Sequence, residues 1–296
     1  MPGLGRLTLL AGALHATLCL AENQPRKPTY ADPNSVDRDY ALQGEYVGLL
    51  SDPDGKSCRS GVQVVALGNG EFRAVHYGGG LPGAGWDEKH RTVAEGCRDG
   101  LVVRFRGDLG SASLRDGDLE ILSPEGDSLG TLKRTIRKSP TLGKKPPGGA
   151  VILFDGNSPD AFLKGRMTSD GLLMQGVTSK RRFGSCRLHL EFRLPYEPLD
   201  RGQDRGNSGV FLQGRFEVQM LDSFGLDGEA DECGGIYQVK APAVNMCLPP
   251  LQWQTFDIDF VAAKYRGGEL VEDPRMTVRH NGVLIHDNVR LPGKRS

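Results

Sequence analysis

Short runs of alternating apolar and polar residues, each ended by glycine, proline, asparagine or aspartate, constrain this chain more than any other feature. In residues 187–194, for example, Leu188, Leu190 and Phe192 alternate with charged residues, which is the period of a strand with one buried face. The 41 Gly and 18 Pro among 296 residues leave no room for a long periodic helix between turns. The sequence therefore predicts an all-β protein.

The alternating runs form two groups, with a proline-rich segment between them. Residues 41–138 hold five or more runs separated by glycine or aspartate turns, which predicts a small antiparallel barrel or sandwich. Residues 151–296 are again built from strands. Residues 22–40 are expected to be a tether, and residues 139–150 a stiff linker. The runs of the first group are Gly44–Leu50, Val62–Leu67, Phe72–Tyr77, Leu101–Arg106 and Leu119–Leu122.

The N-terminus has the pattern of a secretory signal. Arg6 precedes an apolar stretch, residues 7–20, that is too short to span a bilayer and ends at Cys19-Leu20-Ala21 with small residues where a signal peptidase cuts. We expect residues 1–21 to be a signal peptide, the protein to be exported, and no segment to span a membrane. A lipid anchor on Cys19 is the alternative, although Leu18 is large for that motif.

Export makes disulfides possible for the five cysteines that follow the signal. The most economical pairing joins Cys58 to Cys97 and Cys233 to Cys247, leaving Cys186 alone. Five unpaired thiols are the alternative. None of the cysteines has C-x-x-C spacing, so the sequence does not indicate a zinc site.

The charge of the chain is balanced, with 37 Lys+Arg and 37 Asp+Glu. No net field attracts nucleic acid or an acidic membrane, so neither is expected as a partner.

The strands of the second group each have an apolar and a polar face. Arg215–Leu221 places Phe216, Val218 and Met220 in the core, and Trp253–Phe260 does the same with Phe256, Ile258 and Phe260. Met276–Asp287 is a predicted hairpin that turns at Asn281-Gly282. With a two-residue turn, His280 lies on the core face and His286 on the polar face. Strands of this kind predict a two-sheet sandwich.

The polar face of Arg215–Leu221 carries the first candidate for chemistry. Glu217 and Gln219 project side by side, and a β-bulge after them would return Asp222 to the same side. Two carboxylates so placed can act as acid and base at a glycosidic bond. A polar strand that simply faces solvent is the alternative interpretation.

Six motifs in order along the second half then give a family resemblance. Together they resemble the 3-keto-disaccharide hydrolase domain family over about residues 151–293. The N-terminal half is similar, more weakly, to an extra β domain of some planctomycete members. The motifs are Leu153-Phe154-Asp155-Gly156, the segment Gly206–Asp222, Cys233-Gly234-Gly235-Ile236-Tyr237, Pro242-Ala243-Val244-Asn245, Trp253-Gln254-Thr255-Phe256-Asp257 and Val278-Arg279-His280-Asn281-Gly282-Val283.

The resemblance implies a concanavalin A-like jelly-roll sandwich in a bacterial protein, hence a periplasmic or extracellular location. It also implies cleavage of glycosides whose C3 hydroxyl has been oxidised to a ketone. That ketone acidifies the C2 hydrogen, so a base can remove it, the C1 substituent leaves and water adds across the enone. Such a site needs a base, an acid and a positive group for the enolate, which a divalent metal ion could also supply.

Carried onto this sequence, the resemblance assigns Glu217 and Asp222 as the acid–base pair and His286 as a further acid or a metal ligand. Arg215 and Gln219 would hold the enolate or sugar hydroxyls. Substrate contacts are expected from Asn207, Tyr237, Asn245 and Trp253, with Trp253 as a stacking platform for a sugar ring. For the two asparagines, turn capping is the alternative. The acidic run 227–232 is expected to be a solvated loop, with calcium binding as the alternative.

Three functions remain open at this point. An exported enzyme acting on oxidised glycosides is the leading hypothesis, and a non-catalytic, lectin-like carbohydrate-binding protein is the second, because a fold does not fix a function. The chain ends at Ser296, before a strand expected from the family, so a truncated and inactive fragment is the third.

Overall fold

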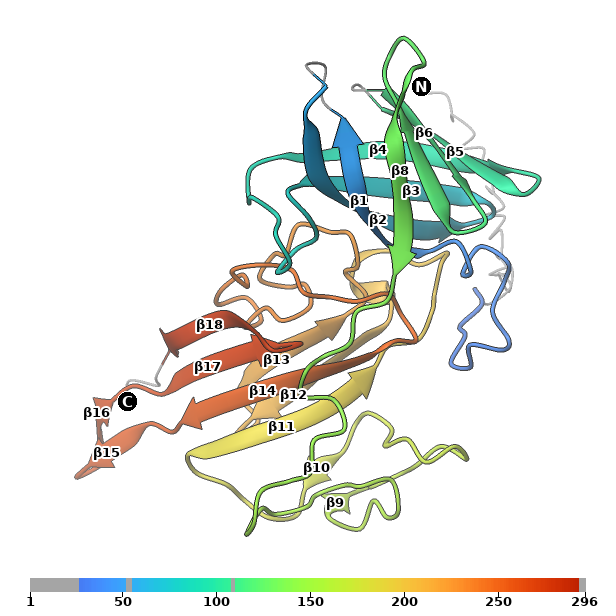
Figure 1. Ribbon diagram of the computed structural model, residues 1–296. Coiled ribbons are helices and arrows are strands. Elements are labelled where there is room, and N and C mark those ends of the chain that lie inside the picture. The colour runs from blue at the N-terminus through green and yellow to red at the C-terminus, as the bar shows by residue number, and fades with distance from the viewer. Residues whose placement is uncertain (1–26, 52–54, 108–109, 293–296) are drawn as a thin grey trace, which may run out of the picture.

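The computed structural model describes residues 27–51, 55–107 and 110–292. The predicted signal peptide and the first part of the predicted tether lie outside these residues. Apart from one short 3-10 turn, η1 (Gly202–Asp204), all regular structure in the described chain is β-strand (Figure 1). The predicted all-β class is therefore confirmed.

The first half is a closed antiparallel barrel. Each strand pairs with the next along the chain, and Glu45 opposite Thr135 closes the first strand onto the last. All five predicted runs lie in strands of this barrel, but the sequence pattern does not predict β4, β6 or β8. The strands are β1 (Gly44–Ser51), β2 (Ser57–Gly68), β3 (Glu71–Gly78), β4 (Arg91–Asp99), β5 (Val102–Gly107), β6 (Gly110–Arg115), β7 (Asp118–Leu122) and β8 (Ser128–Thr135).

The register of the barrel separates two cysteines that were expected to pair. Cys97 in β4 lies opposite Glu71 in β3, which in turn lies opposite Gly68 in β2. Cys58 is ten residues away from Gly68 along β2, since 68 − 58 = 10, and this is roughly 30 Å of strand. A disulfide needs Cα atoms within about 7 Å. The predicted Cys58–Cys97 bridge is therefore wrong for this fold.

The second half contains a four-stranded sheet and a separate hairpin. The sheet has the order β11-β14-β17-β18 and the hairpin is β12-β13. Two further pairs, β9-β10 and β15-β16, are short. The strands are β9 (Phe162–Leu163), β10 (Thr178–Ser179), β11 (Cys186–Arg193), β12 (Asn207–Leu212), β13 (Phe216–Leu221), β14 (Trp253–Val261), β15 (Lys264–Arg266), β16 (Glu269–Glu272), β17 (Arg275–His280) and β18 (Val283–Arg290).

One hydrophobic core joins the four-stranded sheet to the β12-β13 hairpin. The core contains the alternate residues predicted for it, among them Phe216 and Val218 of β13 and Phe256 and Ile258 of β14. Because each strand buries one side in this core, its other side faces outward. The second half therefore has two outer faces, one on the β12-β13 hairpin and one on the four-stranded sheet.

The predicted hairpin between β17 and β18 forms at Asn281-Gly282. Both residues have positive φ, 49° and 82°, as a two-residue type I′ turn requires. His280 pairs with Val283 as predicted, but register shifts between Met276 and Arg279 then change the pairing. His286 lies opposite Val278 instead of opposite Thr277. A shift of one residue moves a side chain to the other face of a sheet, so His286 points toward the core.

The two halves are in direct contact. Figure 1 shows the strand-free region between β13 and β14 lying between the barrel and the four-stranded sheet. Arg201 donates a hydrogen bond to the carbonyl of Leu67, and Arg91 of the barrel forms an ion pair with Asp227 at 2.8 Å. Within the described residues, no helix has the length and apolar character needed to cross a membrane.

Candidate functional site

Glu217 lies in β13, on the face of the hairpin that points away from the core. Its neighbours Phe216 and Val218 are buried, so strand alternation directs the Glu217 side chain outward. The side chain is half-buried, and no residue in the described part of the chain forms a hydrogen bond or an ion pair with its carboxylate. Burial raises the pKa of Glu217 above its ordinary value. The carboxylate is therefore available to a ligand and holds a proton more readily than a solvated one.

Gly209 in β12 makes room for this carboxylate. A Cβ atom built on Gly209 would collide with the carboxyl group of Glu217. The absence of a side chain at Gly209 thus lets the Glu217 carboxylate lie against β12. Any larger residue at this position would displace it.

A cavity of about 490 Å³ opens beside Glu217. Phe211, which lies directly opposite Glu217 in β12 and is 56% exposed, forms part of its wall. Tyr237 forms another part, and its backbone N–H donates to the Glu217 carbonyl at 3.0 Å, which holds the following turn beside β13. The cavity combines one carboxylate, one aromatic face and one phenol, groups that suit a sugar.

Arg215, the residue that precedes β13, also lines this cavity. Its guanidinium lies over the ring of Phe216, 5.1 Å from the ring centroid. No carboxylate among the described residues pairs with it. Three of the predicted site residues, Glu217, Arg215 and Tyr237, are thus brought together.

A network of amide side chains continues the same outer face. Asn207 in β12 donates from Nδ2 to the backbone carbonyl of Gln203 at 2.8 Å and to its Oε1 at 3.1 Å. Gln219 in β13 donates to the same Oε1 at 3.0 Å, and Gln203 donates to the carbonyl of Asp231. Gln219 is buried by these contacts, whereas Asn207 remains exposed with its Oδ1 unused. Asn207 is placed to contact a ligand, and Gln219 is placed to hold the network.

Asp222 does not join Glu217. No bulge interrupts the pairing of β12 with β13, and Asp222 follows the end of β13, buried against Arg205. The carboxylate accepts a hydrogen bond from Arg205 Nε at 2.7 Å, and Arg205 also donates to the carbonyl of Ala66 in the barrel. The expected bulge is absent because the chain turns toward the domain contact at this point. The structure gives Asp222 a structural ion pair and no place in the cavity.

His286 is also away from the cavity, contrary to its predicted polar-face position. The register shift in the β17-β18 hairpin leaves it 2% exposed, with Nε2 hydrogen-bonded to the Gly234 carbonyl at 2.8 Å. Burial lowers its pKa, so the neutral imidazole is favoured. His286 is therefore buried and does not line the cavity beside Glu217.

Asn245 performs the turn-capping role that was the alternative to substrate binding. Its side chain donates to the carbonyls of Ser223 and Leu226, and it accepts a hydrogen bond from the backbone N–H of Cys247. It is 7% exposed. These contacts use the amide fully and fix the strand-free region between β13 and β14.

Trp253 lies on the opposite outer face from Glu217, at the start of β14 in the four-stranded sheet. It is 37% exposed, and the guanidinium of Arg193 lies over its ring at 5.6 Å. Because the core separates the two outer faces, Trp253 does not line the cavity beside Glu217. Phe211 occupies the position beside the carboxylate that an aromatic platform requires.

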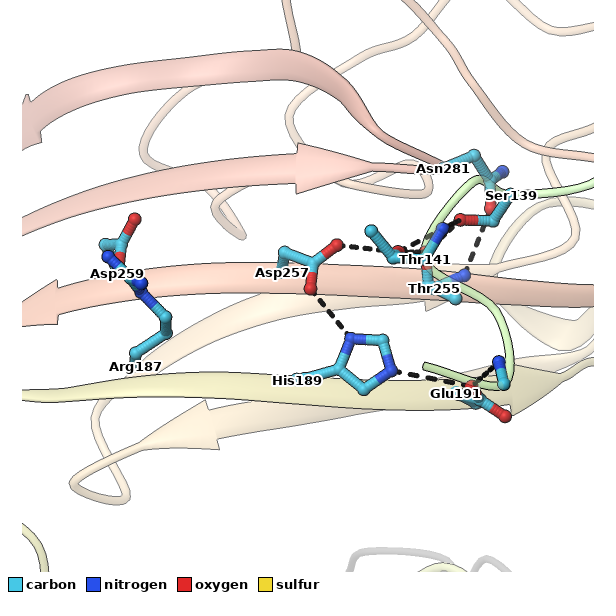
Figure 2. A network of polar contacts seen from close by, with 10 residues as sticks. Ser139, Thr141, Arg187, His189, Glu191, Thr255, Asp257, Asp259 and Asn281 are labelled. Carbon is cyan, nitrogen blue, oxygen red and sulfur yellow. Dashed lines mark hydrogen bonds and ion pairs between the residues drawn. The ribbon is translucent and has the colours of Figure 1, made fainter. Parts of the chain in front are cut away.

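The polar face around Trp253 receives the linker between the halves. Figure 2 shows that Thr141 donates a hydrogen bond to one carboxylate oxygen of Asp257. The other oxygen of Asp257 accepts a hydrogen bond from His189, and Glu191 lies beside the second ring nitrogen of this histidine. Ser139 shares a hydrogen bond of 2.6 Å with Thr255. The polar side chains of β11 and β14 therefore hold residues 139–143 against the sheet. This face is occupied by the chain itself.

Cys233 and Cys247 lie together in the core. Both are buried, and the Cys247 thiol donates to the backbone carbonyls of Leu221 at 3.5 Å and Leu248 at 3.4 Å. Burial, reinforced by the neighbouring Cys233 thiol, raises the pKa of Cys247. The structure therefore places the predicted partners Cys233 and Cys247 close together.

The chemistry of the donor set does not favour a metal at Glu217. Among the described residues, no three His, Cys, Asp or Glu side chains are grouped as metal ligands require. In the acidic run, Asp227 pairs with Arg91 and Glu232 accepts from the backbone N–H groups of Gly228 and Glu229. These carboxylates have protein partners and do not converge.

Two residues of the site were not predicted from the sequence. Phe211 alternates with Asn207 and Gly209 along β12, so the period of two places it on the ligand face once β12 is recognised. Gln203 lies in η1, outside any strand pattern, and no local signal indicates its role in the network.

Comparison with known proteins gives a family match and a similar solved structure. Residues 149–296 match the model of the 3-keto-alpha-glucoside-1,2-lyase-like domain. A solved structure of a "putative glycosyl hydrolase" from Parabacteroides distasonis is 31% identical over 50% of this chain and 68% of that chain, with a TM-score of 0.45. No curated protein matches the chain. By the match over residues 149–296, the chain belongs to the family of 3-keto-alpha-glucoside-1,2-lyase-like domains.

Proposed function

We propose that this chain cleaves the glycosidic bond of 3-keto glycosides by elimination, with Glu217 as the base that removes the C2 proton. The family supports a carbohydrate substrate and a glycoside-cleaving reaction. The observation that carries the assignment is the Glu217 carboxylate, which lines a cavity, has a raised pKa and has no partner in the described structure. A pKa moved toward neutrality makes a carboxylate a more effective general base.

The reaction follows from the ketone at C3. Glu217 takes the proton from C2, and the electron pair of that C–H bond passes into an enolate. The enolate then forms the C1–C2 double bond as the bond from C1 to the leaving oxygen breaks, and that oxygen takes a proton. Water next adds across the enone, with its oxygen at C1 and a proton at C2. The net change is hydrolysis of the glycosidic bond.

A single carboxylate in the cavity fits this chemistry better than ordinary glycoside hydrolysis does. Most glycosidases use two carboxyl groups that flank the bond to be broken. Here Asp222 is paired with Arg205, so Glu217 is the one carboxylate that the described residues bring to the cavity. Elimination needs one base, a proton donor for the leaving oxygen and positive charge near the enolate. The Tyr237 hydroxyl and the Arg215 guanidinium, which line the same cavity, are assigned to the last two roles.

Phe211 and Asn207 are assigned to binding. The exposed face of Phe211 suits the apolar face of a pyranose ring, and the unused Oδ1 of Asn207 suits a sugar hydroxyl. Both project from the face that holds Glu217. We further propose that residues 151–296 are a concanavalin A-like jelly roll and that the protein works after export from a bacterial cell.

Glu217→Gln tests the function directly. The wild-type chain is incubated in D2O with a 3-keto glucoside and with the parent glucoside, and products are followed by NMR and mass spectrometry. We expect cleavage of the keto form alone, deuterium at C2 of the product, and a rate reduced by about 10²–10⁴-fold in the variant. Retained binding without turnover by the wild type would instead establish a lectin. Cleavage of the parent glucoside without exchange at C2 would overturn the elimination.

A further inference from the structure

A second cavity, of about 700 Å³, lies at one end of the barrel. The segment that precedes β1, the β4-β5 turn and the β6-β7 turn surround it, together with the C-terminal part of β8. None of its lining residues belongs to the site around Glu217. Its charge and shape indicate a binding site of a different kind.

Arg134 is held in place in this cavity without being neutralised. Its guanidinium donates to the carbonyls of Ala41 at 2.7 Å and Gln43 at 2.9 Å. The side chain lies along Gly44, where a Cβ would come within 3.1 Å of its Nε. Carbonyl oxygens fix the position of a cation but do not cancel its charge, and no carboxylate in the described chain pairs with Arg134. A fixed, uncompensated guanidinium is suited to bind an anion.

The other charges of the cavity leave a positive excess. Arg98 is paired with Asp39 at 2.6 Å, and Lys133 is paired with Asp118 at 2.6 Å. Asp116, which also lines the cavity, forms an ion pair with Arg115 at 3.7 Å. Arg38 has no partner among the described residues. The cavity therefore presents two uncompensated guanidinium groups in a chain whose total charge is zero.

An exposed apolar side chain lies beside these cations. Leu101, in the β4-β5 turn, is 74% exposed. It differs in this from Leu50 and Ile121 of the barrel wall, which are half-buried and pack against the barrel core. Leu101 and the two guanidinium groups together suit a ligand with an anionic group on an apolar face. A pyranose ring that bears a carboxylate has this combination.

We propose that this end of the barrel binds a saccharide that carries a carboxylate, that is, a uronic acid unit. Arg134 and Arg38 hold the carboxylate, and Leu101 packs against the ring. The choice of a sugar over other organic anions rests on the proposed carbohydrate function of the second half. The choice of an anion rests on the cavity alone.

The test measures binding of trigalacturonate to the full chain by calorimetry at low and high salt. We expect binding that weakens with salt, because exposed charges are screened. Arg38→Gln and Arg134→Gln should each weaken it by about tenfold, the size of one charge-assisted contact. Arg38 is exposed and forms no hydrogen bond or ion pair within the described structure, so its variant should fold normally even if Arg134→Gln does not. Arg266→Gln, in the exposed strand β15, is the matched control and should bind like the wild type.

Two further ligands separate the possible outcomes. The fully methyl-esterified trisaccharide lacks the charge, and inorganic phosphate lacks the ring, so we expect both to bind at least tenfold more weakly. Equal binding of the methyl ester, equal binding of phosphate, or no binding of trigalacturonate would each overturn the proposal. Cleavage of a 3-keto glucoside should be unchanged in Arg38→Gln. That assay reports on Glu217 independently, so failure of one proposal does not imply failure of the other.

Discussion

Phe211 and Glu217 lie directly opposite each other in the β12-β13 hairpin, on the face that points away from the core. Directly opposed residues in an antiparallel pair have their Cβ atoms about 4.5–5.5 Å apart. An exposed aromatic ring and an unpartnered carboxylate therefore share one wall of the cavity. This pairing lets the site position a sugar ring while the carboxylate reaches one of its C–H bonds.

Phe211→Ala should weaken substrate binding with little effect on folding. The ring is 56% exposed, so its removal leaves no cavity in the core. Loss of aromatic packing is worth about 0.5–1.5 kcal/mol, which corresponds to a rise in KM of about two- to tenfold. Steady-state kinetics and thermal unfolding measure the two effects. Leu49→Ala, at another exposed apolar residue, is the control and should leave KM unchanged.

Gly209→Ala should reduce kcat while the protein remains folded. The added methyl group would meet the flexible carboxyl end of Glu217 and not the backbone, so the carboxylate moves aside. Misplacement of a catalytic group by about 1 Å can cost about 10²-fold in rate. Gly148→Ala, where a Cβ meets nothing within 4 Å, is the matched control. Full activity in Gly209→Ala would show that the position of Glu217 does not matter.

The raised pKa of Glu217 makes a prediction about stability and pH. Burial favours the protonated form, so the folded-state pKa lies above the unfolded one. Stability from the protonated group is fully present below the unfolded pKa and is lost as the pH rises through the folded pKa. Glutamine cannot ionise, so the free energy of unfolding of Glu217→Gln should increase relative to that of the wild type as the pH rises through this range.

Denaturant unfolding of both proteins from pH 4 to pH 7 measures this difference. Glu125→Gln, in the exposed turn between β7 and β8, is the control and should follow the wild type. In the same range kcat/KM should rise, since a general base acts when deprotonated. A fall in the stability of Glu217→Gln relative to the wild type as the pH rises would contradict the burial of a titrating Glu217.

Asp222→Asn should destabilise the protein and leave the chemistry of the folded enzyme intact. Removing one partner of a buried ion pair leaves the charge of Arg205 uncompensated, at a cost of about 3–5 kcal/mol. Denaturant unfolding measures the loss, and activity is normalised to the folded fraction. Glu217→Gln should show the reverse pattern, with stability kept and activity lost. A large fall in normalised kcat for Asp222→Asn would return this residue to the catalytic site.

The sequence predicted structure best where the pattern within a single strand decides which of its residues are buried. The apolar residues of β11, β13 and β14 and the Asn281-Gly282 turn follow from local alternation and turn chemistry, and the structure has them as predicted. The strands β4, β6 and β8 were not predicted, because β6 is mostly small residues and β4 and β8 carry few apolar ones. These strands form because closure of the barrel pairs both of their edges.

The errors concern relationships between segments. His286 changed face through a register shift, which depends on the pairing of two strands and not on either alone. Asp222 pairs with Arg205, 17 residues earlier in the chain, and both lie where the barrel meets the second half. Trp253 does alternate onto a polar face, but only the fold shows that this face is on the other side of the core.

Cys233 and Cys247 should form a disulfide when the protein matures in an oxidising compartment. Both are buried, and the Cys233 thiol lies close enough to Cys247 to raise its pKa. In the folded protein the raised pKa of Cys247 keeps thiolate scarce, so exchange with oxidised glutathione should be slow and bond formation should occur mainly during folding. Each bridge formed reduces one glutathione disulfide to two glutathione thiols. The bridge closes a loop that spans 14 positions, since 247 − 233 = 14. Closing a loop of this length should stabilise the folded protein by about 3 kcal/mol.

Alkylation of the denatured protein without reduction, followed by peptide mass spectrometry, measures the outcome. After oxidative refolding we expect Cys97 and Cys186 to be alkylated and Cys233 and Cys247 to be protected. Cys233→Ser should expose Cys247 to alkylation and remove the added stability, while Cys97→Ser should change neither. Full alkylation of Cys233 and Cys247 in the oxidatively refolded wild type would show that the pair stays reduced. In that case their contact serves only to fill the core beneath the strand-free region between β13 and β14.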